Sequence, residues 1–221
     1  MKFAAEQILD KQGEQIVQDS KIYLFLKRLI DIVGAGIGLI VASPIMLIVA
    51  ILIKIEDPKG PIIFAQERNG QYPKTFRMYK FRSMYVDAEE RLQDLLHLNE
   101  QSGPAFKIKD DPRITKIGKF IRKTSLDELP QLINILKGEM SIVGPRPAIL
   151  REVQLYNDYQ MQRLLVKPGL TCIWQVSGRN NIGFDEWVEL DIKYIKTRNL
   201  WLDIKLILMT IPALLGDETA S

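Results

Sequence analysis

The longest apolar run of the chain lies near its beginning, between residues 29 and 55. It contains only two charged side chains, Asp31 and Lys54. A run of about 20 apolar residues is long enough to cross a bilayer as a helix. Pro44 lies in the middle of the run, where it removes a helical hydrogen bond and forces a kink. Ser43 can return a hydrogen bond to the freed backbone carbonyl.

The flanks of this run favour a segment that turns back over a straight span. Basic residues stand at both ends: Lys27, Arg28, Lys54 and Lys59. Positive charges mark the cytoplasmic side of a membrane segment. As helices, the halves before and after Pro44 would be about 22 and 18 Å long, so neither crosses a core of about 30 Å. We therefore predict a re-entrant helix-break-helix at residues 23–55, broken at Ser43 and Pro44, with a kinked span as the alternative.

Shorter patterns downstream predict a mostly helical α+β domain with a small β component. Residues 61–70 and 74–84 alternate enough to form a hairpin with Asn69 and Gly70 in the turn. Helical periodicity recurs over residues 86–101, 129–137, 150–167, 185–197 and 200–215. The expected organisation is a polar segment at 1–22, the membrane hairpin at 23–55, and a cytosolic catalytic domain with membrane-surface helices at 56–221.

A dinucleotide-binding motif is suggested by Gly34 and Gly36 but is not completed. The third glycine position of G-x-G-x-x-G is Leu39, where a glycine should permit close helix–strand packing. The segment that follows stays apolar and contains Pro44, which fits a βαβ unit poorly. We therefore do not expect a Rossmann fold.

Composition excludes several classes of protein. Hydrophobic residues make up 47 % of the 221 residues and charged residues 26 %, a balance typical of globular proteins rather than disordered ones. A net charge of +3 is too small to predict a nucleic-acid partner. The single cysteine, Cys172, cannot form an internal disulfide. The first 20 residues contain no apolar stretch of the secretory-signal type.

An adjacent acidic pair, Asp127 and Glu128, begins a predicted helix. Ser125 and Glu128 have the spacing of a capping box, and acids at a helix start are stabilising by themselves. The same place also suits phosphoryl chemistry, since free N–H groups there can bind a pyrophosphate. An ionised aspartate can attack phosphorus, and a neighbouring glutamate can hold Mg²⁺. The spacing alone leaves capping and catalysis both open.

Phosphate binding requires fixed positive charge, and five basic residues are candidates: Lys80, Arg82, Arg122, Arg146 and Arg179. Arginine offers a planar, permanently charged fork that matches phosphate oxygens. Pro145 and Pro147 fix the backbone on both sides of Arg146. A binding role and a simple loop role are both consistent with that pattern.

Several segments together resemble the bacterial sugar transferase family, also called monotopic phosphoglycosyl transferases. They are KRLIDIVGAGIGLIVASP, YKFRSM, RKTSLDELPQLINILKGEMSIVGPRP, KPGLTCIWQVSGRN and LDIKLIL. The resemblance implies transfer of a sugar 1-phosphate from a UDP-sugar to polyprenyl (undecaprenyl) phosphate, with release of UMP. Such a reaction is the first membrane step of exopolysaccharide, capsule, O-antigen or glycoprotein glycan assembly.

The resemblance also implies roles for individual residues. Asp127 corresponds to a nucleophile that forms a phospho-aspartyl intermediate, and Glu128 to a magnesium ligand. Phosphate or nucleotide binding is implied for Arg122, Arg146 and Arg179. Asp203 matches a recurrent acid of the family.

The implied location is the cytoplasmic face of the bacterial inner membrane, where the Ser43–Pro44 hairpin dips into one leaflet. The stretch at residues 99–115 resembles hexose-1-phosphate transferases in particular, many of which carry a large N-terminal membrane region. This chain is expected to have only a short polar lead in its place. Membrane lipid is an expected partner, and a homo-oligomer is compatible with the sequence.

Two other functions remain consistent with the residues. One is a metal-dependent hydrolase or glycosyltransferase that leaves the phosphate behind. The other is a non-catalytic, membrane-anchored scaffold of envelope assembly. The nucleotide released, UMP or UDP, distinguishes the enzymes from each other, and nucleotide-sugar binding distinguishes both from a scaffold.

Overall fold

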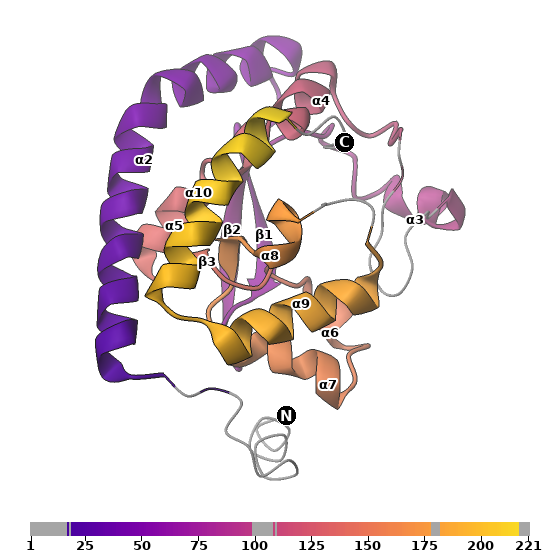
Figure 1. The fold of residues 1–221 in the computed structure, drawn as a ribbon. Coiled ribbons are helices and arrows are strands. Elements are labelled where there is room, and N and C mark those ends of the chain that lie inside the picture. Colours follow the sequence, from indigo (N-terminus) through magenta and orange to yellow (C-terminus); the bar gives the residue numbers. More distant parts are fainter. Residues whose placement is uncertain (1–16, 18, 99–107, 109, 178–181, 217–221) are drawn as a thin grey trace.

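A computed structural model gives the fold and describes residues 17, 19–98, 108, 110–177 and 182–216. Its longest element is helix α2 (Lys21–Glu56), which runs along the outside of the molecule and bends over one end of it (Figure 1). The helix remains continuous through Pro44. The Ser43 hydroxyl donates a 2.8 Å hydrogen bond to the Ile40 carbonyl. In a regular helix this carbonyl would accept a hydrogen bond from the N–H of residue 44, which proline lacks. The predicted return of this hydrogen bond is confirmed, whereas the predicted break is replaced by a bend.

Helix α2 exposes an unusual amount of apolar surface. Within the described residues it alone is long and apolar enough to cross a membrane, and only 11 % of its most apolar 18-residue window is buried. Ile40 and Val41, next to Pro44, are 76 % and 71 % exposed. Apolar surface of this extent marks a membrane or partner contact, so the helix is compatible with membrane association.

The predicted hairpin is confirmed. Strands β1 (Ile63–Asn69) and β2 (Thr75–Phe81) pair in antiparallel register, with Phe64 opposite Lys80. The predicted turn at Asn69 and Gly70 is wrong, since Asn69 pairs with Thr75. Residues 70–74 form a longer loop, which is closed by a 2.9 Å hydrogen bond from the Gly70 N–H to the Lys74 carbonyl.

The predicted helices at 129–137, 185–197 and 200–215 are confirmed as α5 (Gln131–Lys137), α9 (Phe184–Thr197) and α10 (Leu200–Gly216). Two short parallel strands, β3 (Ser141–Val143) and β4 (Gly169–Thr171), complete the β component. The remaining elements are α3 (Leu92–Leu95), η1 (Leu96–Leu98), α4 (Lys116–Lys123), η2 (Leu126–Glu128), α6 (Leu150–Val153), α7 (Asp158–Met161), η3 (Gln162–Leu165) and α8 (Ile173–Val176).

The helix predicted over residues 86–101 is wrong for the described part of that stretch, where only α3 and the 3-10 turn η1 are helical. In a continuous helix the Leu92 N–H would donate to the Ala88 carbonyl. That carbonyl instead accepts a 3.2 Å hydrogen bond from Arg113, and the Leu92 N–H donates to Glu89. A tertiary contact therefore overrides the local pattern.

The single helix predicted over residues 150–167 is also wrong, because the chain forms α6, α7 and η3 there. Asn157 starts a new helix. Its side chain accepts from the Gln160 N–H at 2.9 Å, and the Gln160 side chain accepts from the Asn157 N–H at 3.0 Å. This reciprocal pair is a capping box, and it divides the stretch.

Two apolar clusters hold these elements together. One joins α2 to β2 and α5 through Ala35, Phe76, Met78, Leu132, Ile135 and Met140. The other joins β3 to α9 and α10 through Val143, Val166, Tyr194, Ile195 and Leu206. The hairpin lies in the middle of the molecule, with α5 between it and α2, which runs along the outside (Figure 1).

Both ends of α2 are bound to the same body. Near its start, the Lys27 ammonium pairs with Asp203 on α10 at 3.0 Å. At its end, the Glu56 carboxylate accepts N–H bonds from Lys116 and Ile117, at 2.8 and 3.0 Å, and so caps α4. The helix is therefore held against the rest of the molecule at both of its ends.

Candidate active site

A cavity of about 560 Å³ opens between the hairpin, the η2 turn, residues 144–149 and the α8–α9 region. The described basic residues that line it are Arg68, Lys80, Arg82, Arg113, Arg122, Arg146, Arg151 and Arg163. The described acids are Glu89, Asp111, Asp127, Glu128 and Glu152. Positive charge exceeds negative charge, so the cavity suits an anionic ligand of the size of a nucleotide.

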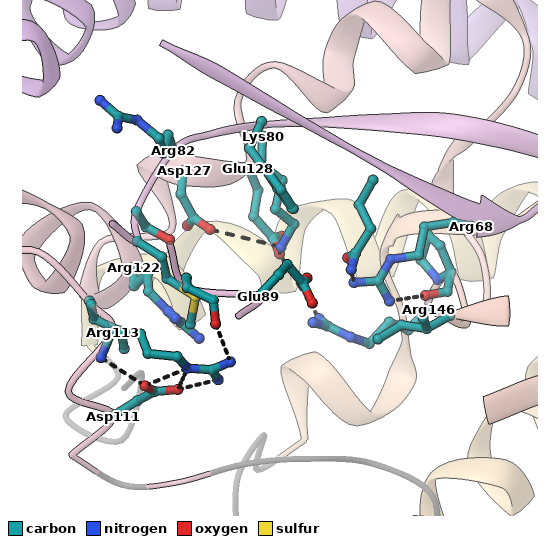
Figure 2. Close-up of a pocket in the computed structure, with 18 of the residues that line it drawn as sticks. Arg68, Lys80, Arg82, Glu89, Asp111, Arg113, Arg122, Asp127, Glu128 and Arg146 are labelled. Atoms are coloured by element: carbon teal, nitrogen blue, oxygen red, sulfur yellow. Dashed lines mark hydrogen bonds and ion pairs between the residues drawn. The ribbon is translucent and has the colours of Figure 1, made fainter. Parts of the chain in front are cut away.

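Asp127 and Glu128 lie at the centre of this cavity beside Lys80 of strand β2 (Figure 2). The Lys80 ammonium is 2.7 Å from Glu128 Oε1 and 3.8 Å from Asp127 Oδ2. The side chains of Asp127 and Glu128 are 10 % and 20 % exposed. The two acids are therefore neighbours that share one cation, from within a mostly buried site.

The backbone around the acidic pair differs from the predicted capping box. Ser125 has a left-handed conformation, with φ at 53°, and its side chain makes no capping hydrogen bond. The pair lies in the 3-10 turn η2, and regular α-helix begins only at Gln131. The left-handed residue reverses the chain after α4, and this places both carboxylates over the cavity.

Burial raises the pKa of Asp127 above the ordinary aspartate value, and the charge of Glu128 adds to this effect. The positive charges of Lys80, Arg122 and Arg146 oppose it by favouring the ionised form. The carboxylate is thus poorly solvated but surrounded by cations. That environment favours a reactive nucleophile over a solvated surface acid.

Arg146 is presented by an unusually constrained backbone. The Gly144 N–H donates to the Thr171 carbonyl and the Gly169 N–H to the Pro145 carbonyl, both at 2.9 Å. A Cβ on Gly144 would lie 2.6 Å from the Lys167 carbonyl, so only glycine allows this approach. The Arg146 side chain keeps 39 % of its surface exposed, and its Nη1 is 4.0 Å from Glu128 Oε1.

The other predicted phosphate-binding residues have different placements. Arg122, at the end of α4, is half-buried and lines the cavity. Burial lowers its pKa, while the charges of Asp127 and Asp111 favour its protonated form. Arg82 pairs with Asp57 at the end of α2, and its guanidinium points away from Asp127 (Figure 2). Arg179 lies outside the described residues.

Asp203 is not brought to the cavity. Its carboxylate accepts hydrogen bonds from Tyr23, Lys27 and Tyr194, at 3.0, 3.0 and 2.6 Å, and it is 2 % exposed. This buried cluster joins α2, α9 and α10. The geometry gives Asp203 a structural role in holding α2 against the domain.

Arg68 on strand β1 lines the cavity but was not predicted from the sequence. It donates to Gln66 Oε1 at 2.7 Å and to the Pro147 carbonyl at 3.1 Å. Burial and the charge of Arg146 lower its pKa to about 10. Side chains alternate between the two faces of a strand, so residues 66 and 68 share one face of β1. The register of the hairpin puts Lys80 on the same face. The alternation in the sequence was therefore a signal for Arg68.

An aromatic wall was also missed. Trp174 and Trp187 stack at 4.7 Å between ring centres and line the cavity beside Arg146, whose guanidinium is 6.0 Å from the Trp174 ring. Of the other large aromatic side chains in the C-terminal helices, two have contrasting environments. Tyr194 is buried, whereas Trp201 is 75 % exposed.

The described part of the chain contains no group of three or more His, Cys, Asp or Glu that could hold a metal ion by itself. A magnesium ion needs less, because it keeps several waters and commonly uses one or two carboxylates together with substrate phosphates. Asp127 and Glu128 supply two such carboxylates in the cavity. This donor set is compatible with a magnesium ion that arrives with a phosphorylated ligand.

Comparison with known proteins gives a consistent result. The chain matches the family model for bacterial sugar transferases over residues 22–217. It is 54 % identical to the galactosyl transferase CpsE of Streptococcus agalactiae, over 87 % of this chain and 43 % of that protein. It is 47 % identical to the undecaprenyl-phosphate galactose phosphotransferase of Salmonella typhimurium, over 89 % and 42 %.

A third relative is the UDP-galactose-lipid carrier transferase of Erwinia amylovora, which is 43 % identical over 89 % of this chain and 42 % of its own length. The chain thus spans less than half the length of these three relatives. Within that span, the match covers α2, the hairpin, the acidic pair and the cavity. The chain belongs to the bacterial sugar transferase family.

Proposed function

We propose that this protein transfers a sugar 1-phosphate from a UDP-sugar to a polyprenyl phosphate and releases UMP. The observation that carries the proposal is the buried carboxylate of Asp127, surrounded by Lys80, Arg122 and Arg146 in a cavity of nucleotide size. The relatives indicate the substrate class, since one is an undecaprenyl-phosphate galactose phosphotransferase and another a UDP-galactose-lipid carrier transferase.

The proposed reaction has two steps at one nucleophile. The Asp127 carboxylate forms a bond to the phosphorus on the sugar side, and the bond from that phosphorus to the bridging oxygen breaks, so that UMP departs with the bonding electrons. An oxygen of the polyprenyl phosphate then attacks the same phosphorus and displaces Asp127 as a carboxylate. Two steps at one aspartate let a soluble and a lipid substrate occupy the site in turn.

The cations of the cavity have defined tasks in this scheme. Arg122 and Arg146 face the charge of Asp127 and would bind the diphosphate oxygens as charge accumulates on them. Glu128 would hold the magnesium ion, with Asp127 close by, and the bound ion would neutralise the diphosphate. Glu128→Gln should therefore abolish activity, and excess EDTA should do the same to the wild type. Full activity in either case would remove magnesium from the scheme.

The bent helix α2 supports a re-entrant placement at the cytoplasmic face of the inner membrane. Its apolar surface near Pro44 is exposed, whereas both of its ends bind the catalytic body. A helix that crossed the bilayer would have to place those ends on opposite sides. Insertion of the bend into one leaflet would keep both ends, and the cavity, at the surface where the polyprenyl phosphate presents its head group.

The test is an assay with purified protein, undecaprenyl phosphate and a panel of UDP-sugars, in which the released nucleotide is identified. The proposal expects UMP together with a lipid-linked diphosphate sugar. Release of UDP would indicate a glycosyltransferase, and free sugar phosphate would indicate a hydrolase. If no UDP-sugar raises the melting temperature or releases nucleotide, the scaffold function replaces the proposal.

A further inference from the structure

Lys80 contacts the carboxylate of Glu128, to which the proposed function assigns the magnesium ion. Its ammonium is 2.7 Å from Glu128 Oε1 and 3.8 Å from Asp127 Oδ2. Arg146 is more distant from the same glutamate oxygen, at 4.0 Å. Of these two cations, Lys80 is the nearer counter-ion of the acidic pair.

A magnesium ion bound to Glu128 Oε1 would compete with this ammonium for the charge of the carboxylate. Magnesium binds carboxylate oxygen at about 2.1 Å. With the ammonium 2.7 Å from Glu128 Oε1, the two cations would be no more than about 4.8 Å apart. At this separation, inside a cavity that screens charge poorly, a divalent and a monovalent cation repel strongly. Either the metal binds weakly or Lys80 leaves.

Lys80 has the means to leave. Its side chain is 18 % exposed and borders the 560 Å³ cavity. A lysine stem is flexible and carries a compact point charge. However, a displaced ammonium needs a new anionic partner, because an unpaired charge in a mostly buried site is unfavourable. The diphosphate of a nucleotide would supply one in the same cavity.

We infer that Lys80 competes with the metal ion for Glu128 and moves onto the diphosphate when it binds, so that metal ion and diphosphate bind cooperatively. The inference rests on the proposed function and adds an order of events to it. Metal alone competes with Lys80 and binds weakly. Metal with a diphosphate binds tightly, because the diphosphate accepts the lysine that the metal displaces.

The experiment measures Mn²⁺ binding to the full chain by the electron paramagnetic resonance signal of free Mn²⁺, with and without UDP. Association of Mn²⁺ with UDP in buffer is subtracted, and UDP carries no sugar phosphate, so no turnover occurs. For the wild type, we expect UDP to tighten Mn²⁺ binding at least tenfold. For Lys80→Met, we expect Mn²⁺ alone to bind at least tenfold tighter than to the wild type, and UDP to add less than threefold.

Lys123→Met is the matched control, because it removes an exposed lysine from α4 and should leave both values as in the wild type. Lys80→Gln repeats the test if Lys80→Met does not fold. Equal Mn²⁺ affinity in the wild type and Lys80→Met, or an undiminished effect of UDP in the variant, overturns the inference while leaving the proposed function intact. Failure of both proteins to bind Mn²⁺, with UMP still released in EDTA, removes the magnesium role and the inference with it.

Discussion

Several backbone constraints together fix the position of the Arg146 side chain. The loop that carries Arg146 makes two hydrogen bonds with strand β4. Gly144 has no room for a Cβ, and a proline stands on each side of the arginine. These constraints fix the place of Arg146 opposite Glu128. Such rigidity has value only if the geometry of the guanidinium matters, since any lysine would supply the charge. We expect Arg146→Lys to lower kcat/KM for UMP release at least tenfold, or about 1.4 kcal/mol.

Arg77→Lys is the control for this substitution, because Arg77 is exposed on strand β2 and does not line the cavity. Its kinetics should match those of the wild type. A loss below threefold for Arg146→Lys would show that only its charge is used, and that the rigid loop serves the fold alone.

At the residue scale, the sequence predicted which side chains lie in the site better than it predicted how those side chains are paired. The acidic pair, Lys80, Arg122 and Arg146 were all predicted as candidates, and all line one cavity. Arg82 also lines the cavity, yet its guanidinium pairs with Asp57 and not with the acidic pair. No local pattern distinguishes the two cases, because the partner of Arg82 comes from the end of α2, 25 residues earlier.

At the scale of elements, α2 and α4 are joined by one carboxylate. Glu56, the last residue of α2, accepts both the Lys116 and Ile117 N–H groups at the start of α4. Capping of this kind stabilises a helix by about 1 kcal/mol. Helix α4 in turn carries Arg122 into the cavity. Helix α2 therefore helps to hold a site residue in place.

We expect Glu56→Ala to accelerate amide hydrogen exchange over residues 116–123 by about fivefold, which corresponds to the loss of about 1 kcal/mol of local stability. Mass spectrometry of peptides from this region measures the rate. Glu189→Ala, which removes an exposed acid from the middle of α9, should leave it unchanged. Unaltered exchange in Glu56→Ala would mean that packing alone fixes the start of α4.

Elements were predictable where the local pattern and the tertiary contacts agree. The hairpin and helices α5, α9 and α10 follow from periodicity, because each packs its apolar face as the pattern indicates. The patterns at 86–101 and 150–167 fail for identifiable reasons. Arg113 takes the Ala88 carbonyl in the first, and Asn157 starts a new helix in the second. Both failed predictions depend on single polar groups, and the periodicity of apolar residues carries no information about them.

At the scale of the whole molecule, the proposed re-entrant path predicts that both ends of α2 lie on the same side of the membrane. Cysteines introduced at the exposed positions Lys21 and Lys59 report on its two ends. The native Cys172 is fully buried and should not interfere. We expect a membrane-impermeant maleimide to label both positions only after the cells are permeabilised, because the proposed re-entrant path keeps both ends on the cytoplasmic side. Labelling of position 21 in intact cells would contradict the re-entrant path.

The central claim is that Asp127 carries the sugar phosphate during turnover. Capping alone would make Asp127→Asn a change of about 1 kcal/mol or less in stability, with activity retained. Nucleophilic catalysis would instead make it a folded but inactive protein. Burial and the surrounding cations of Asp127 favour the second outcome.

The most direct measurement is intact mass spectrometry of the purified protein after addition of a UDP-sugar without lipid acceptor. The account predicts a mass increase of one sugar phosphate in the wild type, its absence in Asp127→Asn, and its loss when undecaprenyl phosphate is added. A wild type that forms no adduct, with kinetics that require both substrates bound at once, would contradict the account and replace it with direct transfer in a ternary complex.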